Sequence, residues 1–322
     1  MIKARVAGAL MLCGLIAAPL PAAQAQALKK ISDGQVSKTA PNWPNFIANE
    51  KGFFRREGIE LETTYVGNVA NTVQQLVAGS FDVASSTFDT AVRAIGNGGN
   101  AIMIGGIVTK YPYSIMSVAD VKAAADMKGK KVILPFPKDL LTIVWNRWLT
   151  EQGVKPADVE QVYTGATPNR LAALVSGAVQ AALLTQPFDF RAAAQGYRKL
   201  VDLGGFGKEY GFLTTLARPQ WLRDNPDTAR GYLRALSAAV DWLYDPANHD
   251  EAIAILARET KLEPAIATQT YDYYIKDLQP FSRKLAIPDQ IVSGTVKTLV
   301  DLGDIKPDAV TTKYVDSSYL PR

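Results

Sequence analysis

The sequence contains an internal repeat, which appears when the chain is aligned with itself at an offset of 98 residues. Residues 65–71 (YVGNVAN) then match 163–169 (YTGATPN), and 76–79 (LVAG) match 174–177 (LVSG). In each copy a strand leads into a Gly-containing loop, a helix begins near the Asn and stops at a Gly, and an apolar strand follows. Generic β-α-β units share these features, so chance similarity is one explanation. The other is a pair of related α/β lobes whose strand-end loops line a shared cleft.

Strand-like and helix-like segments alternate along the first two thirds of the chain. Such alternation is typical of an α/β protein with mainly parallel sheets, because parallel strands need helical crossovers between them. The size of the chain also suits two lobes better than a single core. We expect strands over residues 31–36, 59–66, 82–85, 101–108, 131–134, 159–163, 181–184 and 212–217.

The last third of the chain is helical in pattern. Helices are predicted over 226–244, 250–260, 263–275 and 287–302. If this segment returns to the first lobe, the chain crosses between lobes twice, near 108–114 and 204–211, and two crossings form a hinge. We therefore expect a leader at 1–25, lobe I at 26–110, lobe II at 111–208, and the return strand of lobe I with the C-terminal helices at 209–322.

The N-terminus has the features of a secretory signal peptide. Lys3 and Arg5 precede an apolar run over 6–21, and residues 23–25 (AQA) supply a small-residue cleavage signal. The run is short for a membrane span, which disfavours a retained anchor. Cys13 lies inside the run and not at its end, where a lipoprotein signal places its cysteine. We expect a free periplasmic protein.

Removal of the leader changes both the charge balance and the cysteine content. It takes two of the 35 basic side chains and leaves 33 against 31 acidic ones. A balance so close to neutral predicts no basic patch and no nucleic-acid partner. The one cysteine is also lost, which excludes disulfides, thiolate nucleophiles and cysteine-based metal sites from the mature chain. We expect no cofactor and no metal.

Several short motifs together resemble a known family. They are residues 46–54 (FIANEKGFF), 57–59 (EGI), 76–84 (LVAGSFDVA), 127–132 (MKGKKV) and 315–320 (VDSSYL). In this order they resemble the type II periplasmic solute-binding proteins of ABC transporters, in the nitrate, sulfonate, taurine and thiamine-pyrimidine-precursor group. The resemblance implies a two-lobed Venus-flytrap fold, no catalysis, a small polar or anionic and possibly aromatic solute, a permease partner in the inner membrane, and a monomer.

The resemblance also implies that the solute contacts loops at the strand ends. In this sequence the matching positions in the first lobe and the first crossing are Trp43, Asn45, Asn68, Val69, Ser86, Thr87 and Tyr113. The matching positions in the second lobe and the return strand are Phe136, Lys138, Asp139, Gly165, Thr167, Gln186 and Phe212.

Each of these positions also has a purely structural interpretation. Trp43 either stacks on a planar solute or staples its helix to the lobe. One residue of 85–87 caps the following helix, and Gln186 before a proline is a cap or turn residue. Phe212 is a core aromatic or a site residue. Lys138 and its acidic neighbour fit a solvated helix turn, although the lysine also suits a carboxylate or sulfonate.

The prolines at 135 and 137 depart from the pattern expected for an anion cradle. Proline lacks the backbone N–H that would bind an anion, and Phe136 between them fills space. This composition favours a bulkier or partly aromatic solute over nitrate or a small sulfonate.

Two other function classes remain open. Enzymes occur on related folds, including the thiamine-pyrimidine synthase, which resembles this family in sequence and whose chemistry needs histidine and a cysteine-rich iron site. Here the single histidine, His249, lies in a polar turn. A solute-binding partner of a membrane sensor would use the same two-lobed clamp, so the sequence does not separate it from a transport protein.

Overall fold

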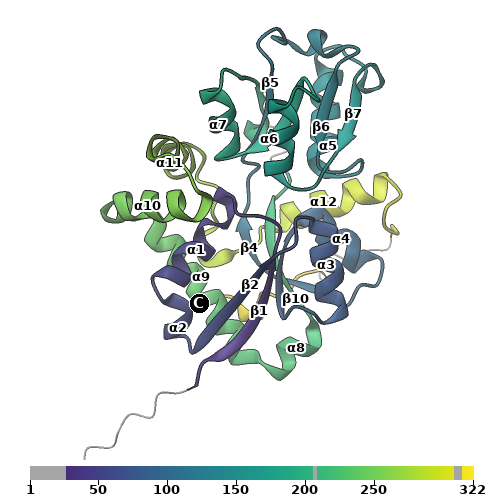
Figure 1. Ribbon diagram of the computed structural model, residues 1–322. Helices are drawn as coiled ribbons and strands as arrows, with labels where there is room; N and C mark the ends of the chain where they lie inside the picture. The colour runs from purple at the N-terminus through teal and green to yellow at the C-terminus, as the bar shows by residue number, and fades with distance from the viewer. Residues whose placement is uncertain (1–26, 206–208, 308–313) are drawn as a thin grey trace, which may run out of the picture.

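The computed structural model describes residues 27–205, 209–307 and 314–322, and it shows two α/β lobes, one above the other in Figure 1. The expected signal peptide at 1–25 lies outside these residues. Within the described ranges, no helix is long and apolar enough to cross a membrane.

Lobe I, the lower lobe in Figure 1, is built on a five-stranded sheet in the order β2-β1-β3-β10-β4. Strand β10 pairs antiparallel with both of its neighbours, and the other strands run parallel to one another. The strands are β1 (Lys29–Gln35), β2 (Ile59–Tyr65), β3 (Val83–Thr87), β4 (Ile102–Val108) and β10 (Leu213–Ala217).

Lobe II repeats this topology with a sheet in the order β7-β6-β8-β5-β9. Its antiparallel member is β5, which follows the first crossing. The strands are β5 (Tyr113–Ser117), β6 (Lys131–Leu134), β7 (Glu160–Tyr163), β8 (Ala181–Thr185) and β9 (Arg198–Asp202). The expected fold class, a two-lobed α/β protein with mainly parallel sheets, is confirmed.

Helices cover both sheets, and the C-terminal helices pack on lobe I, as Figure 1 shows. Lobe II carries α5 (Leu140–Glu151), α6 (Thr167–Val175) and α7 (Phe188–Ala194). Lobe I carries α1 (Trp43–Glu50), α2 (Phe53–Arg56), α3 (Val69–Ala78), α4 (Phe88–Gly96), α8 (Pro219–Asp224), α9 (Pro226–Tyr244), α10 (His249–Thr260), α11 (Pro264–Tyr271) and α12 (Asp289–Asp301). A π-helical turn, Asp272–Leu278, follows α11.

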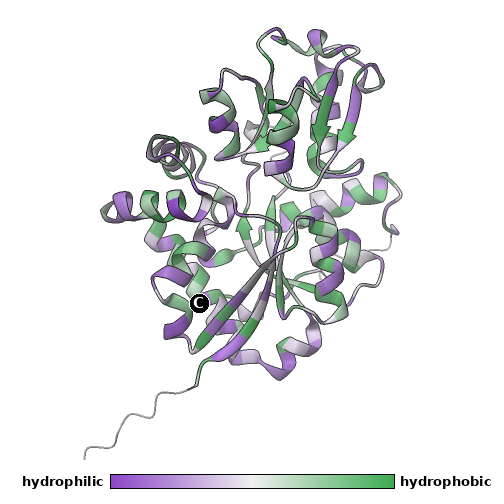
Figure 2. Ribbon diagram, in the orientation of Figure 1, coloured by the Kyte–Doolittle hydropathy of each residue, from purple (hydrophilic) through white to green (hydrophobic). Residues whose placement is uncertain are grey.

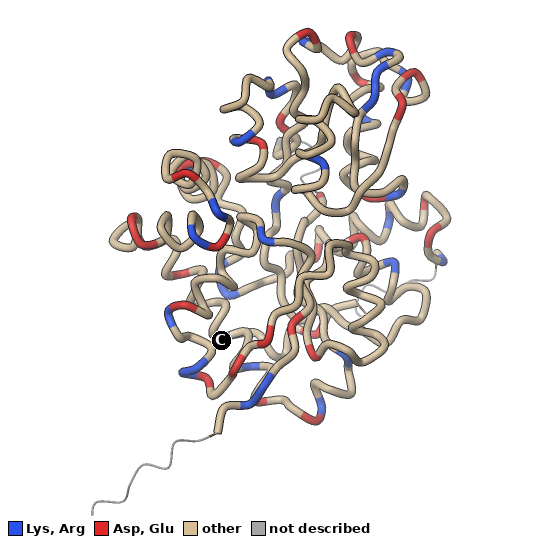
Figure 3. The backbone as a smooth tube through the Cα atoms, viewed as in Figure 1, with Lys and Arg blue, Asp and Glu red and all other residues tan. Residues whose placement is uncertain are grey.

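The packing of α9 shows how the hydrophobic pattern fixes a helix in place. Tyr232, Leu236 and Val240 recur at helical spacing, and all three are buried, as the sequence predicts. The Tyr232 ring stacks on Phe54 of α2 with 5.4 Å between centroids. Hydrophobic residues concentrate in the strands and on the inner helix faces (Figure 2), whereas charges of both signs are scattered over both lobes (Figure 3).

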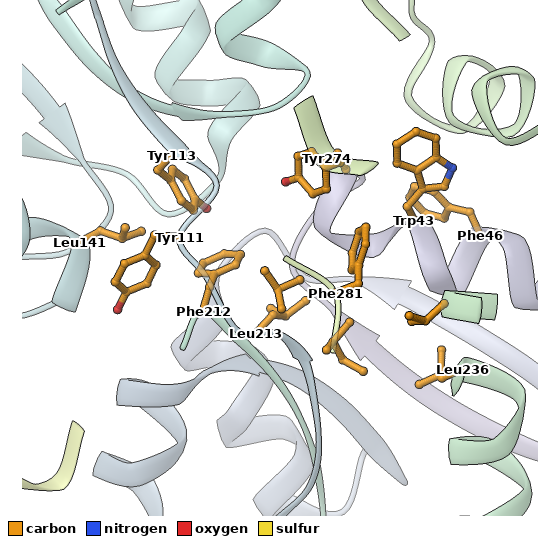
Figure 4. Packing of buried hydrophobic residues seen from close by; sticks show 14 of the residues in the cluster. Trp43, Phe46, Tyr111, Tyr113, Leu141, Phe212, Leu213, Leu236, Tyr274 and Phe281 are labelled. Carbon is orange, nitrogen blue, oxygen red and sulfur yellow. The ribbon is translucent and has the colours of Figure 1, made fainter. Parts of the chain in front are cut away.

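An aromatic cluster lies where the chain crosses between the lobes (Figure 4). Tyr111 and Tyr113 come from the first crossing and Phe212 from the second. The Phe212 ring contacts Tyr113 edge to face at 5.0 Å and Tyr111 at 6.2 Å. Edge-to-face contacts of this kind are favourable, so the cluster ties the two crossings together at one point.

The structure corrects the predicted elements at three places. Strands β5 and β9 were not expected. The first lies in what we took for a crossing, and the second, RKLVD, carries three charged residues at a sheet edge. The predicted helix over 263–275 is α-helical only through Tyr271, after which the turns widen into the π-helical segment.

Candidate functional site

A cavity of about 60 Å³ lies between the two lobes, beside the aromatic cluster. Roughly 10–15 Å³ of such volume holds one water molecule, so the cavity has room for a small solute. Its walls are formed by Val36, Ser37, Thr39, Pro41, Asn42, Val69, Ser85, Thr87, Tyr113, Pro135, Phe136, Asp139, Leu141, Gly165, Thr167, Arg170, Phe212 and Leu213. The strand-end loops of both lobes thus meet at this cavity.

The end of strand β3 forms part of the lobe I wall. Ser85 and Thr87 line the cavity, whereas Ser86, which we expected there, does not. Successive side chains of a strand point to opposite faces, so Ser86 cannot share the face of its two neighbours. Thr87 is also the N-terminal cap residue of α4, and its hydroxyl donates to Thr90 Oγ1 at 2.9 Å.

The lobe II wall contains a buried arginine, Arg170 of α6, whose residue is only 1% exposed. Its guanidinium donates to the Leu183 carbonyl oxygen at 2.6 Å, to the Thr164 and Gly165 carbonyl oxygens at 2.9 and 2.7 Å, and to Thr167 Oγ1 at 2.8 Å. All of these partners are neutral. The positive charge of Arg170 is therefore held rigidly beside the cavity without a direct carboxylate partner.

The Tyr113 hydroxyl interacts with Arg170 and Thr167. Burial raises the pKa of Tyr113 to about 12, although the nearby Arg170 charge lowers it. The phenol therefore keeps its proton at neutral pH.

Two carboxyl groups from opposite lobes come close together next to the cavity. Asp89 lies in the first turn of α4, and Asp139 caps α5 by accepting a hydrogen bond from the Leu141 backbone N–H at 2.9 Å. Burial raises the pKa of Asp139 to about 8, and the negative charge of Asp89 adds to the increase. A largely protonated Asp139 leaves Arg170 as the main charge on the cavity wall near neutral pH.

The lobes touch through several polar contacts around the cavity. The Ala40 backbone N–H donates to the Gln186 carbonyl oxygen at 3.1 Å, and the Leu140 N–H of lobe II donates to the Asp89 carboxylate of lobe I at 3.3 Å. Lys138 of lobe II pairs with Asp304 of lobe I at 2.5 Å. The lobes are thus closed over the cavity.

The predicted site residues divide into two groups. Val69, Thr87, Tyr113, Phe136, Asp139, Gly165, Thr167 and Phe212 line the cavity, and the structure brings them together. Trp43, Asn45, Asn68, Ser86, Lys138 and Gln186 do not line it.

Four of the residues that lie off the cavity have clear structural partners. Trp43 is fully buried, and its Nε1 donates to the Ala252 carbonyl oxygen at 3.1 Å, which fits the staple interpretation. In Figure 4 Trp43 lies next to Phe46, and Tyr274 lies between Trp43 and Tyr113. Asn68 caps α3 through the Asn71 N–H, Gln186 donates to the buried Asp189 carboxylate at 2.6 Å, and Lys138 forms the contact between lobes described above.

His249, the single histidine, contacts Tyr271 and Asp250 and does not line the cavity. Across residues 27–205, 209–307 and 314–322, no group of three or more His, Cys, Asp or Glu side chains could hold a metal ion.

Comparison with known proteins shows which family the chain belongs to. The family model described as "NMT1/THI5 like" matches residues 42–249, which include most of the cavity wall. The chain belongs to the NMT1/THI5-like family. The expected kinship with the nitrate- and sulfonate-binding group of periplasmic substrate-binding proteins is confirmed.

Individual relatives of this NMT1/THI5-like protein support the same grouping. The nitrate/nitrite binding protein NrtA of Synechococcus elongatus is 26% identical over 152 residues, which cover 45% of this chain and 34% of NrtA. The alkanesulfonate-binding protein SsuA of Xanthomonas axonopodis pv. citri, bound to MOPS, superposes with a TM-score of 0.74 at 18% identity, covering 89% of this chain and 98% of SsuA. The nitrate-binding protein NrtA of Synechocystis PCC 6803 superposes with a TM-score of 0.75 at 18% identity, covering 91% of this chain and 87% of NrtA.

Sequence reasoning missed the most unusual residue of this NMT1/THI5-like site. Arg170 shares the buried face of α6 with Thr167, Leu171 and Leu174. An arginine at a position where helical spacing demands an apolar residue is a signal in itself, since buried arginines are rare. The offset of 98 residues also aligns Arg170 with Thr72, which is fully buried in lobe I.

Proposed function

We propose that this protein is the substrate-binding component of an ABC importer and that it captures a small solute with a negatively charged group between its two lobes. In this proposal it acts in the periplasm as a monomer, delivers its solute to an inner-membrane permease and performs no chemistry. Its family and the names of its relatives support the transport role. The buried, unneutralised charge of Arg170 carries the proposal for an anion.

The energetic argument rests on the cost of burying a charge. A guanidinium removed from water is destabilising unless it is paired, and hydrogen bonds to neutral partners compensate only part of that cost. Burial lowers the pKa of Arg170, but an arginine remains charged in proteins. An anion in the cavity supplies the missing countercharge, so Arg170 favours anionic over neutral solutes.

The remaining walls limit the size and shape of the solute. Phe136, Tyr113 and Phe212 supply aromatic surface, while Gly165 leaves little space. A Cβ atom at that position would lie 3.2 Å from both the Gly67 carbonyl oxygen and the Phe136 ring. The walls therefore suit an organic anion with a small apolar part, such as a short sulfonate or carboxylate.

Calorimetric titration of the purified protein tests this proposal. The panel contains nitrate, ethanesulfonate, 2-aminoethanesulfonate, 2-hydroxyethanesulfonate, benzoate, short carboxylates and the neutral amides of the same acids. We expect at least one anion to bind and its neutral amide to bind about 100-fold more weakly or not at all, because the amide cannot neutralise Arg170. Mass spectrometry of the recovered solute should show no chemical change.

Two variants separate the role of Arg170 from general stability. Arg170→Gln should weaken anion binding about 100-fold. Arg218→Gln is the matched control, since Arg218 also donates to backbone carbonyl oxygens, those of Leu76 and Phe81, but does not line the cavity. A protein that binds only neutral or cationic solutes, or that turns its solute over, contradicts the proposal.

A further inference from the structure

A chain of hydrogen bonds runs from a buried carboxylate in lobe I to the cavity wall. Asp33 and Gln35 lie on the same face of β1, and Gln35 Nε2 donates to both Asp33 carboxylate oxygens at 3.0 Å. Asn42 Nδ2 donates to Gln35 Oε1 at 2.8 Å, and Thr39 Oγ1 donates to Asn42 Oδ1 at 3.0 Å. Thr39 and Asn42 line the cavity, whereas Asp33 and Gln35 lie behind it.

The ionised carboxylate of Asp33 fixes the direction of every bond in this relay. A carboxylate only accepts hydrogen bonds, so the amide nitrogen of Gln35 must face it, and the amide oxygen must face Asn42. That oxygen can only accept, so Asn42 turns its own nitrogen toward Gln35 and its oxygen toward Thr39. The Thr39 hydroxyl hydrogen is thereby committed to Asn42. The Asn42 amide carries two N–H hydrogens, and one of them is donated to Gln35. The other does not change which way the hydrogen bonds of the relay point.

The environment of Asp33 supports the ionised form at mildly alkaline pH. The Thr63 hydroxyl donates to its second oxygen at 3.3 Å, in addition to the two contacts from Gln35. Burial raises the pKa of Asp33 to about 7, and these hydrogen bonds limit the increase. Asp33 itself is fully buried, so its charge acts on the cavity through the relay and not by contact with a solute.

We infer that Asp33, acting through Gln35 and Asn42, holds the Thr39 hydroxyl as a hydrogen-bond acceptor toward the cavity, so that the captured solute carries an O–H or N–H donor as well as its negative group. Asp33 is a positioning residue in this scheme, and Thr39 contacts the solute. The inference rests on the proposed capture of an anion and adds a second requirement to it. Among the described residues, no side chain and no backbone N–H donates a hydrogen bond to Thr39 Oγ1, so the oxygen retains its lone pairs for a solute.

Paired anions that differ only by a donor test this requirement. We use 2-hydroxyethanesulfonate against propane-1-sulfonate, and 3-hydroxypropanoate against butanoate, because in each pair a hydroxyl replaces a methyl group. Titrations are run at about pH 8.5, above the pKa of about 7 of Asp33, so that its carboxylate is ionised. The hydroxylated member should bind roughly 10-fold to 100-fold more tightly, because the methyl group leaves Thr39 without a partner.

Variants of the relay should change this ratio without abolishing anion binding. In Asp33→Asn the new amide can donate to Gln35, so the relay can reverse and the preference should fall to about twofold or less. The matched control is Asp189→Asn, an equally buried carboxylate that accepts from Gln186 but has no connection to a cavity-lining side chain. It should keep the wild-type ratio. If Asp33→Asn does not fold, Thr39→Val removes the acceptor from the cavity wall and should likewise remove the preference.

The outcomes separate this inference from the proposed function. If no anion of the panel binds, the capture of an anion fails and the inference falls with it. If anions bind but both members of each pair bind equally, or nitrate is preferred to all hydroxylated anions, the role of the relay is overturned. The proposed capture of an anion between the lobes is then unaffected. Retention of the full preference in Thr39→Val also overturns it.

Discussion

Replacement of Asp139 by Asn should remove a pH dependence from solute binding. The Asp139 carboxyl lines the cavity with Arg170, and burial followed by the charge of Asp89 raises its pKa to about 8. An anion bound nearby favours the protonated form further, so the complex holds this proton more tightly than the free protein does. Binding is then accompanied by proton uptake above the pKa of the free protein.

The size of the effect follows from one linked proton. Below about pH 8 the affinity for a sulfonate should be nearly constant, because Asp139 is already protonated in the free protein. Above that value the dissociation constant should rise by up to about tenfold per pH unit, which corresponds to about 1.4 kcal/mol. A sulfonate is the suitable ligand because it does not titrate in this range. Asp139→Asn should show a flat profile.

Titration calorimetry between about pH 6 and pH 10 in buffers of different ionisation enthalpy measures both the affinity and the protons taken up. The other ionisable groups around Asp139 are Asp89, Arg93, Arg170, Tyr111 and Tyr113. Burial raises the pKa of Tyr111 well above its usual value. The pKa of Tyr113 is about 12, so its phenol does not titrate in this window. Asp189→Asn, which changes a buried carboxyl away from the cavity, should keep the wild-type slope. An affinity that stays constant or rises with pH in the wild-type protein refutes the reasoning.

Three further substitutions test the structure around the site. Trp43→Phe removes the hydrogen bond to the Ala252 carbonyl oxygen and should cost about 1–2 kcal/mol in urea unfolding, with an unchanged solute Kd because Trp43 does not line the cavity. Asp304→Asn weakens its pairing with Lys138 across the lobes, so solute release in stopped-flow experiments should accelerate by a few-fold to about tenfold. Gly34→Ala would place a Cβ atom 2.5 Å from the Phe81 ring and should lower the free energy of unfolding by about 1–3 kcal/mol, measured by thermal denaturation. Weaker solute binding in Trp43→Phe would contradict the contacts described. An unchanged rate of solute release in Asp304→Asn, or an unchanged free energy of unfolding in Gly34→Ala, would also contradict them.

Much of the fold could be predicted because its signals are local. Strand β6 and helix α9 begin and end at the predicted residues, since apolar runs and flanking prolines or glycines mark them. Strand β9 was missed because its sequence, RKLVD, has the polar composition of a loop. Only pairing with β5 at the sheet edge makes it a strand.

The site was predicted less completely, because it depends on side-chain direction and on contacts between distant segments. Ser86 was chosen instead of Ser85 because the sequence places both in the same strand without fixing which face meets the cavity. Trp43 was expected beside the solute, but its ring packs in the core of lobe I, where it contacts Ala252 of α10 and Tyr271 of α11. Arg170 was missed because solute contacts were sought in the loops at the strand ends, whereas Arg170 lies inside α6.

The position of β10 in the lobe I sheet has a consequence for how the chain acquires its structure. This strand lies between β3 and β4, yet it follows the whole of lobe II in the sequence. During synthesis the lobe I sheet therefore stays incomplete between β3 and β4. Strand β4 has no strand to pair with until residues 213–217 are synthesised. Lobe II is contiguous and meets no such delay. We expect lobe II to fold first and to protect its amide protons earlier in pulse-labelled hydrogen exchange, since pairings between distant segments form slowly.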